Sequence, residues 1–265
     1  MVSLQTQNLK MNLFLAKALF FTFLVICLAS CASRSDIAYL QNADNYQGGQ
    51  AVAFEPTLQP DDLLSIIVSA TTPEVTVPFN LPQIQGNYEV NNNQNGIKTY
   101  LVDNAGFIDF PVIGRIKLAG LTRTEAKNKL TAAISEFITD PSINLRILNY
   151  KIAVIGEVGR PGTFRIDSER LTLFEALSLA GDLTIYGRRD NILIIREVDG
   201  LKSFHRVDIT QADFIDSPFY YLKQNDQLVI EPNKTRMNAS VYGQNLSFIL
   251  SAASLALTMG LIIFR

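Results

Sequence analysis

Histidine, cysteine and excess positive charge are what this sequence has least of. It contains one histidine and two cysteines in 265 residues, and its formal net charge is -2. A zinc site or a Ser/His/Asp triad would need His205 to act without its usual neighbours, so we interpret His205 as a strand residue. Cys27 lies in an apolar run that we expect to be removed, which would leave no disulfide pair. Without a basic excess, nucleic acid is not an expected partner.

The sequence also lacks the residue sets of the common catalytic sites. It has no paired carboxylates with a supporting context, no metal-binding cluster and no recognisable activated nucleophile. We therefore predict that the protein is not an enzyme and that it uses no metal and no cofactor. With 48% apolar residues, the chain is long enough for one or two folded cores and for membrane segments.

Residues 1–30 have the pattern of a secretory signal peptide. Lys10 and Lys17 precede an apolar run over 18–28, and small residues follow before Cys31. The letters L-A-S-C that end at Cys31 resemble the bacterial lipoprotein box, which implies that Cys31 is the site of lipid attachment. Several acyl chains on one cysteine would anchor the protein firmly. The alternative is an uncleaved signal anchor, for which the apolar run is short.

The stretch Lys151–Asp182 carries the strongest local signals in the chain. A β-branched run over 152–155 predicts a strand that enters a tight, irregular turn, and the chain extends again over 163–166. Glycine permits positive φ and proline restricts φ, and the turn contains both residue types: Gly156, Gly159, Pro161 and Gly162. The glycine spacing fits neither a P-loop nor a dinucleotide motif, so we interpret the turn as structural.

A helix is expected directly after this second strand. Thr172 is placed to cap the helix, with Glu175 reaching back to the cap amide, and Gly181 stands where a left-handed C-terminal residue is needed. The local order is therefore strand, glycine turn, strand and helix.

Residues 56–149 predict a small α+β unit. A turn over 56–62 leads into a strand over 63–68, and residues 71–98 are expected to form a long surface loop because they are rich in proline and asparagine. Such a loop either contacts polymer or a neighbouring subunit, or is disordered. The segment Tyr100–Arg115 predicts a hairpin with its turn at 103–106.

A second capping box opens a helix at Leu121, and a strand is expected over 142–148. One face of this helix is apolar and consists of Ala126, Leu130, Ala133, Ile134 and Phe137. Later in the chain, 191–196 and 204–207 predict paired strands around the turn Asp199-Gly200, and 227–231 predicts the last strand. The aromatic residues Phe214, Phe219, Tyr220 and Tyr221 could stack on sugar faces, but packing is the commoner role of such residues.

Two phrases occur twice in the sequence. L-T-x-x-E-A begins at Leu121 and again at Leu171, and a looser pattern, L-x-x-x-D-x-L-x-I, covers 58–66 and again 222–230. Two related α+β units in tandem would explain both repeats, although short capping phrases also recur by chance.

These motifs resemble the outer-membrane polysaccharide export (OPX) lipoprotein family. Residues 154–164, V-I-G-E-V-G-R-P-G-T-F, together with 171–181, resemble its soluble-ligand-binding β-grasp (SLBB) repeat. Residues 102–114, V-D-N-A-G-F-I-D-F-P-V-I-G, resemble the diagnostic segment of its polysaccharide export domain. The resemblance covers about residues 56–233.

The expected fold class is α+β, with tandem small α/β units (an export domain plus a β-grasp-like SLBB domain) and a C-terminal transmembrane helix. The expected boundaries are a signal peptide over 1–30, a tether over 31–55, the export domain over 56–149, the SLBB domain over 150–233, a linker over 234–245 and the transmembrane helix over 246–264.

The transmembrane prediction rests on an uncharged run over 246–264. At about 1.5 Å per residue this run is about 28 Å long, close to the thickness of the bilayer's hydrocarbon core. The hydroxyl residues Ser247, Ser251, Ser254 and Thr258 fall on one line of the helix. This stripe is a candidate for helix packing or for lining the water-filled lumen of a ring of helices.

The resemblance implies a lipoprotein with a periplasmic body that passes capsular or exopolysaccharide across the outer membrane. Because a lone helix makes no channel, its implied partners include itself as a cyclic homo-oligomer. The others are the polysaccharide chain, membrane lipid and an inner-membrane polysaccharide co-polymerase or polymerase. The alternative is a membrane-tethered glycan-binding β-grasp module without channel activity. A further alternative makes the C-terminal helix an inner-membrane anchor.

Overall fold

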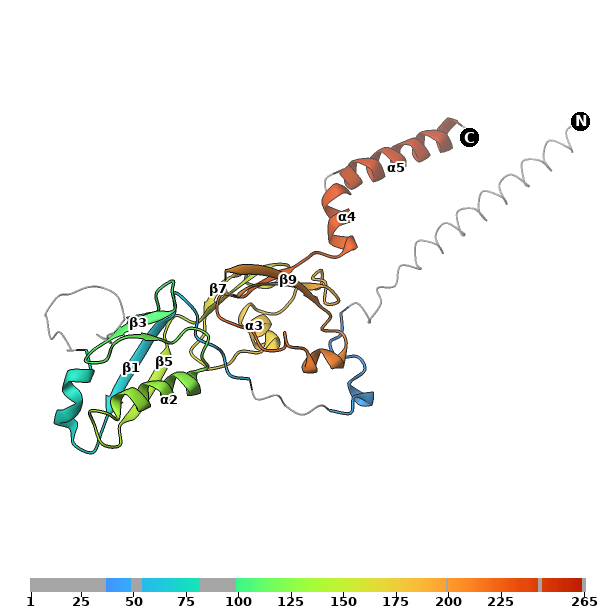
Figure 1. The fold of residues 1–265 in the computed structure, drawn as a ribbon. Coiled ribbons are helices and arrows are strands. Elements are labelled where there is room, and N and C mark those ends of the chain that lie inside the picture. The colour runs from blue at the N-terminus through green and yellow to red at the C-terminus, as the bar shows by residue number, and fades with distance from the viewer. Residues whose placement is uncertain (1–36, 49–53, 82–98, 199, 243–244, 264–265) are drawn as a thin grey trace, which may run out of the picture. The chain divides into compact units, whose positions relative to one another are not determined.

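The computed structural model describes residues 37–48, 54–81, 99–198, 200–242 and 245–263 (Figure 1). The chain divides into two compact units, Met1–Ala38 and Tyr39–Arg265, and every element below belongs to the second unit. The predicted signal peptide and Cys31 lie outside the described residues. Helices and sheets are mixed along the chain, so the predicted α+β class is confirmed.

Two hydrophobic cores form within this unit. The first gathers buried residues between Leu58 and Leu145, and the second gathers buried residues between Tyr150 and Ile230. Ile147 packs against both cores. We call residues 56–149 the N-terminal module and residues 150–233 the C-terminal module, which are the ranges expected for the two tandem units.

The N-terminal module is built on β1 (Leu63–Ser69), the central strand of a three-stranded antiparallel sheet. Its neighbours are β2 (Tyr100–Leu101) and β5 (Ser142–Ile147). Leu64, Ile66 and Val68 alternate along β1 and point into the core. Helix α2 (Arg123–Ile134) lies beside this sheet (Figure 1).

Helix α2 begins as the sequence predicts. The Thr122 side chain accepts a hydrogen bond from the Glu125 amide, and the Glu125 carboxylate accepts one from the Thr122 amide. The buried helical residues are Ala126, Leu130 and Ile134. Phe137 follows the end of the helix and is exposed, contrary to the prediction, because the chain leaves its helical path there and buries Ile138 instead.

The predicted hairpin over Tyr100–Arg115 pairs differently from the expectation. The turn at 103–106 forms, because the Asp103 side chain accepts hydrogen bonds from the amides of Ala105 and Phe107. However, β2 pairs with β1, and the hairpin consists of β3 (Phe107–Phe110) and β4 (Gly114–Lys117). Pairing with a distant strand therefore overrides the local sequence pattern.

The C-terminal module contains a five-stranded sheet in the order β7-β6-β10-β8-β9. Its strands are β6 (Lys151–Gly156), β7 (Gly162–Arg165), β8 (Ile192–Val198), β9 (Leu201–Val207) and β10 (Gln227–Ile230). The pair β10 and β6 is parallel, and the other pairs are antiparallel. The predicted hairpin around Asp199-Gly200 is confirmed as β8 and β9.

Helix α3 (Leu173–Leu179) and the short helix η4 (Ala212–Asp216) complete this module. The predicted capping box of α3 is confirmed, and Gly181 has φ of +74° after the helix end. Leu173, Ala176 and Leu177 face the core. His205 lies on β9, as predicted, and its ring stacks on Phe219 at 4.2 Å between centroids.

Two segments expected to be open are partly ordered. Within the predicted tether, the amides of Leu40 and Gln41 donate to backbone oxygens of Ile209 and Thr210, next to helix η2 (Ala43–Asn45). Within the predicted long loop, helix η3 (Pro73–Phe79) buries Phe79 in the first core, because Asn80 bonds the backbone of β1. Residues 82–98 lie outside the described residues.

Two further helices follow β10. They are α4 (Lys234–Tyr242) and α5 (Asn245–Ile263), so the predicted C-terminal run is helical. Within the described part of the chain, none of the helices has the length and apolar character needed to cross a membrane. The predicted transmembrane helix over 246–264 is thus not supported.

Candidate functional site

The glycine turn of the central stretch is a close-packed crossing of backbones. Gly156 has φ of +99°, and a Cβ placed there would lie 2.0 Å from the carbonyl oxygen of Ile230. A Cβ on Gly159 would lie 2.6 Å from the carbonyl oxygen of Gly181. Only glycine fits these two positions. Gly162 has open space around it, so its place after Pro161 is not required by packing.

The amides of this turn are already used within the fold. Glu157 donates to the Ile230 oxygen, Gly159 donates to the Asp182 oxygen, and Arg160 donates to the Ala180 oxygen. A phosphate cradle needs backbone N–H groups that point at the ligand. The turn therefore holds β6, β10 and the end of α3 together and offers no anion site.

The repeated pattern L-x-x-x-D-x-L-x-I folds into two turns of the same geometry. We call them the first turn (Leu58–Asp62), which precedes β1, and the second turn (Leu222–Asp226), which precedes β10. The aspartate at the end of each turn accepts a hydrogen bond from the amide three residues before it, at 2.8 Å from Gln59 and 2.7 Å from Lys223. In both turns the leucine and the aspartate are buried.

The backbone conformations of the two turns also agree. Asp61 and Asn225 both have positive φ, +67° and +64°, and their amides both donate at 2.9 Å to a carbonyl of a neighbouring segment. The acceptors are the oxygens of Val102 and Lys151. Aspartate and asparagine tolerate this left-handed conformation better than most residues. The internal repeat is thus a structural repeat at these turns.

The two turns differ in the partners of their buried carboxylate. In the second turn, Asp226 is paired with Arg196 of β8, whose Nη2 lies 2.6 Å from Oδ2 and whose Nε lies 2.9 Å from Oδ1. In the first turn, Asp62 is fully buried and its Oδ1 has no hydrogen-bond partner among the described residues. Burial raises the pKa of Asp62 to about 6, and the neighbouring Asp61 carboxylate adds to this rise.

Asn149 joins the two turns at the boundary between the modules. Its side-chain oxygen accepts from the Leu63 amide at 2.9 Å, and its side-chain nitrogen donates to the Asp61 oxygen at 2.8 Å. Its backbone oxygen accepts from the Gln224 side chain at 2.9 Å, and the Gln224 side-chain oxygen accepts from the Lys151 amide at 2.8 Å. Nothing in the local sequence pattern indicated this role, because the partners of Asn149 lie 75 to 88 residues away.

A cleft of about 1030 Å³ lies where both turns reach the surface. Residues 57–61 of the first turn region and Lys223 and Asn225 of the second line it, together with residues from β4, β6, β7 and the β8–β9 hairpin. Its lysines are Lys117, Lys151 and Lys223, and its acidic residues are Asp61 and Glu197. Sequence reasoning missed this site, since its residues come from both modules.

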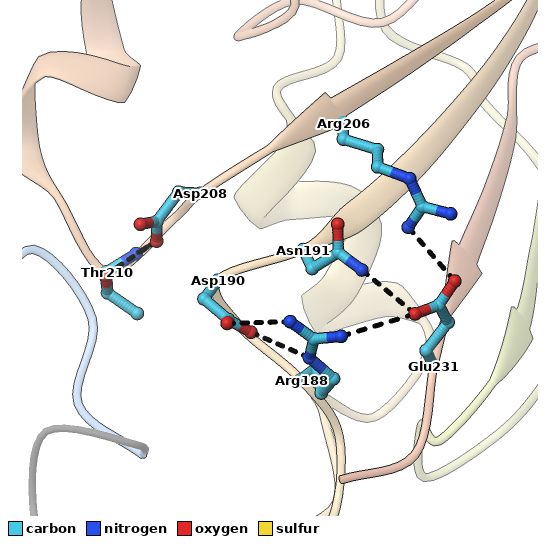
Figure 2. A network of polar contacts seen from close by, with 7 residues as sticks. All are labelled: Arg188, Asp190, Asn191, Arg206, Asp208, Thr210 and Glu231. Carbon is cyan, nitrogen blue, oxygen red and sulfur yellow. Dashed lines mark hydrogen bonds and ion pairs between the residues drawn. The ribbon is translucent and has the colours of Figure 1, made fainter.

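A polar network marks the point where the chain leaves β10 (Figure 2). The Glu231 carboxylate accepts hydrogen bonds from Asn191 at 2.9 Å and Arg206 at 3.0 Å, and it lies 3.6 Å from Arg188. The Arg188 guanidinium also binds Asp190, which lowers the pKa of that carboxyl. Arg236 of α4 then pairs with Glu157 at 3.4 Å. Among these partly exposed pairs, Arg236–Glu157 connects α4 to the turn after β6, and each pair contributes little energy.

The aromatic residues named from the sequence pack within the C-terminal module. Phe214 is buried, Tyr220 makes edge contacts with Phe214 and Phe174, and Tyr221 stacks on Phe54 at 4.8 Å. The packing interpretation is therefore confirmed for these rings. Among the described residues, no group of three or more histidine, cysteine or acidic side chains could hold a metal ion.

The hydroxyl stripe of α5 bonds to its own helix where the structure describes it. Ser254 donates to the Ser251 oxygen at 2.9 Å, and Thr258 donates to the Ser254 oxygen. The side chain of Ser247 lies outside the described residues. Large apolar side chains on the same helix are exposed, namely Phe248, Ile249, Leu250, Leu255 and Met259. The hydroxyls of Ser254 and Thr258 are thus small groups, satisfied within the helix, on an element with an apolar surface.

Comparisons with known proteins identify one part of the chain. Residues 50–148 match the family model described as polysaccharide biosynthesis/export protein. The EPS I polysaccharide export outer membrane protein EpsA of Ralstonia solanacearum is 37% identical over 179 residues, which are 65% of this chain and 47% of the relative. The protein of the same name from Ralstonia nicotianae is 34% identical over 141 residues, which are 51% of this chain and 37% of the relative.

The chain spans less than half the length of the curated relatives it matches. The matched family is one of transport proteins, in agreement with the prediction that the chain is not an enzyme. The names of both relatives place them in the outer membrane, in agreement with the predicted location.

Proposed function

We propose that this protein is an outer-membrane component of polysaccharide export, because residues 50–148 match the polysaccharide biosynthesis/export family model. The observation that carries the proposal is that this matched segment contains a complete hydrophobic core of its own, from Leu58 to Leu145. The described residues of the matched segment thus share a core, which supports the proposal that they act as an export module. The named role of the EpsA relatives supports extending this function to the chain.

The finer part of the proposal is that copies of the chain assemble into a cyclic homo-oligomer through which the glycan passes. Cys31 would be acylated and hold the protein at the outer membrane, with the two modules in the periplasm. The C-terminal module would be the SLBB domain of the assembly. An inner-membrane polysaccharide co-polymerase or polymerase would supply the chain.

Helix α5 is the element that we assign to contacts between copies. Its apolar side chains are exposed in the single chain, and burying them between neighbouring helices would remove them from water. The small residues Ser251, Ser254 and Thr258 would allow the helices to approach closely. We therefore prefer helix packing to pore lining for the stripe Ser247, Ser251, Ser254 and Thr258.

Secretion by a strain that lacks its own copy of this gene tests the function. Expression of the full chain should restore the secreted polysaccharide, and Cys31→Ser should reduce it because the lipid anchor is lost. Normal secretion in the deleted strain would refute the proposed role. Sedimentation of separated membranes gives the location, and recovery of the acylated protein in the inner membrane alone would contradict it.

Oligomeric state separates the channel from its alternative, a membrane-tethered glycan-binding β-grasp module. Light scattering of the detergent-extracted chain should give a single species of several copies. Ser254→Phe in α5 should lower that mass if the stripe packs between helices. A strictly monomeric wild-type protein would favour the binding module.

A further inference from the structure

We propose that the cleft between the first and second turns binds an anionic segment of the exported glycan. This inference rests on the proposed function, since it specifies the chemistry of the chain that the protein handles. It assigns a binding role to residues from both modules: Lys117 from the N-terminal module, and Lys151 and Lys223 from the C-terminal module.

The charges in the cleft favour an anionic ligand. Three lysines line it and come from separate elements: Lys117 from β4, Lys151 from β6 and Lys223 from the second turn. In the described part of the chain none of the three forms an ion pair, whereas four arginines of the C-terminal half, outside the cleft lining, are all paired: Arg188, Arg196, Arg206 and Arg236. Glu197, one of the two acidic residues of the cleft, pairs at 4.0 Å with Lys202, which does not line the cleft. The uncommitted charge of the cleft is therefore mainly positive.

The neutral polar groups of the cleft suit sugar hydroxyls. Asn104, Asn225 and Gln227 are among its lining residues, and among the described residues their side-chain amides form no hydrogen bond. An amide offers two donors and an acceptor, which matches a hydroxyl that both donates and accepts. These groups would give a sugar ring its orientation, while the lysines would select for charge.

The walls of the cleft are rigid. Asp61 and Asn225, at the tips of the two turns, are held in the left-handed conformation by backbone hydrogen bonds, and the Asn149 and Gln224 side chains tie the turns to each other. A site that is already ordered loses little conformational entropy when a ligand binds. A volume of about 1030 Å³ is at the upper end of ligand pockets, and it suits a short oligosaccharide better than a single small molecule.

Binding of defined oligosaccharides to the full chain in detergent tests this proposal. The probes are oligogalacturonate, which carries a carboxylate on each sugar, and a neutral maltooligosaccharide of the same length, both measured by titration calorimetry. We expect the anionic probe alone to bind, and its affinity to fall when salt is added. Equal binding of the two probes would overturn the assignment.

The double variant Lys151→Gln/Lys223→Gln should weaken oligogalacturonate binding about tenfold, because each exposed charge pair changes an affinity by up to about fivefold. The matched control is Lys127→Gln/Lys234→Gln, which removes the same charge from exposed positions outside the cleft and should leave binding unchanged. Equal thermal melting of both variants shows that the fold is intact. An unchanged affinity in the cleft variant would refute the site.

Secretion separates this inference from the proposed function. If the wild-type chain restores secretion but oligogalacturonate does not bind, the export role stands and the anionic site is wrong. If the wild-type chain fails to restore secretion, the export role itself is wrong.

Discussion

The buried carboxyl of Asp62 should make the stability of this protein depend on pH in an unusual direction. The pKa of Asp62 is raised from an ordinary 3.8 to about 6 in the folded protein, mainly by burial. The folded state therefore binds the proton more tightly than the unfolded state does. The stabilising effect is present below the unfolded pKa and is lost as the pH rises through the folded pKa.

The size of the effect follows from the shift. Two pKa units correspond to about 3 kcal/mol, which is the largest loss of unfolding free energy expected between pH 4 and pH 8 from this one group. The substitution Asp62→Asn removes the ionisable group, keeps an acceptor for the Gln59 amide and is otherwise similar in shape. We expect it to match the wild type at pH 4 and to exceed it by up to about 3 kcal/mol at pH 8.

Urea unfolding of the full chain in detergent, followed by circular dichroism from pH 4 to pH 8, measures this difference. Asp109→Asn changes an exposed aspartate of the same module and should give no such trend. Asp226→Asn should destabilise the protein at both pH values, because it leaves Arg196 buried without its carboxylate. A difference between Asp62→Asn and wild type that is absent at pH 8, or constant with pH, would refute the reasoning.

Three further predictions concern the scaffold around the two turns. Gly156→Ala should lower the free energy of unfolding by at least about 3 kcal/mol or prevent folding, since its Cβ would lie 2.0 Å from the Ile230 oxygen. Gly162→Ala, in open space, should change that free energy by no more than about 0.5 kcal/mol. Urea unfolding of both variants measures the two changes. Arg196→Met should lower the free energy of unfolding by about 3–5 kcal/mol, because it leaves the buried Asp226 carboxylate unpaired. Adding Asp226→Leu should recover part of that loss. A double-mutant cycle of unfolding free energies tests both expectations. Asn149→Ala should cost about 1–3 kcal/mol and increase hydrogen exchange in both turns at once; exchange confined to one turn would contradict the proposed link.

Local elements of the fold could be predicted because their causes are local. The capping boxes at Thr122 and Thr172 and the left-handed Gly181 depend on residues within one helical turn of each other. The same holds for the β8–β9 hairpin, where a short turn joins strands that are adjacent in sequence. The ends of these elements were less accurate, as the exposed Phe137 shows.

Strand pairing could not be predicted where it joins distant segments. Tyr100 and Leu101 were expected to pair within their own hairpin, but they pair with β1, because the edge of β1 offers them unsatisfied backbone groups. The tether was expected to be open because it is polar, yet its backbone found partners at Ile209 and Thr210. Composition reports the average tendency of a segment and contains no information about such a partner.

The sequence by itself determined that the pattern L-x-x-x-D-x-L-x-I occurs twice, at 58–66 and at 222–230, and so indicated an internal repeat. Only the tertiary structure decided that the two turns differ in chemistry. Arg196 comes from β8, and the order of the sheet brings it to Asp226 and leaves Asp62 without a cation. The cleft has the same origin, since its lysines and amides are far apart in the chain and only the tertiary fold brings them to one site.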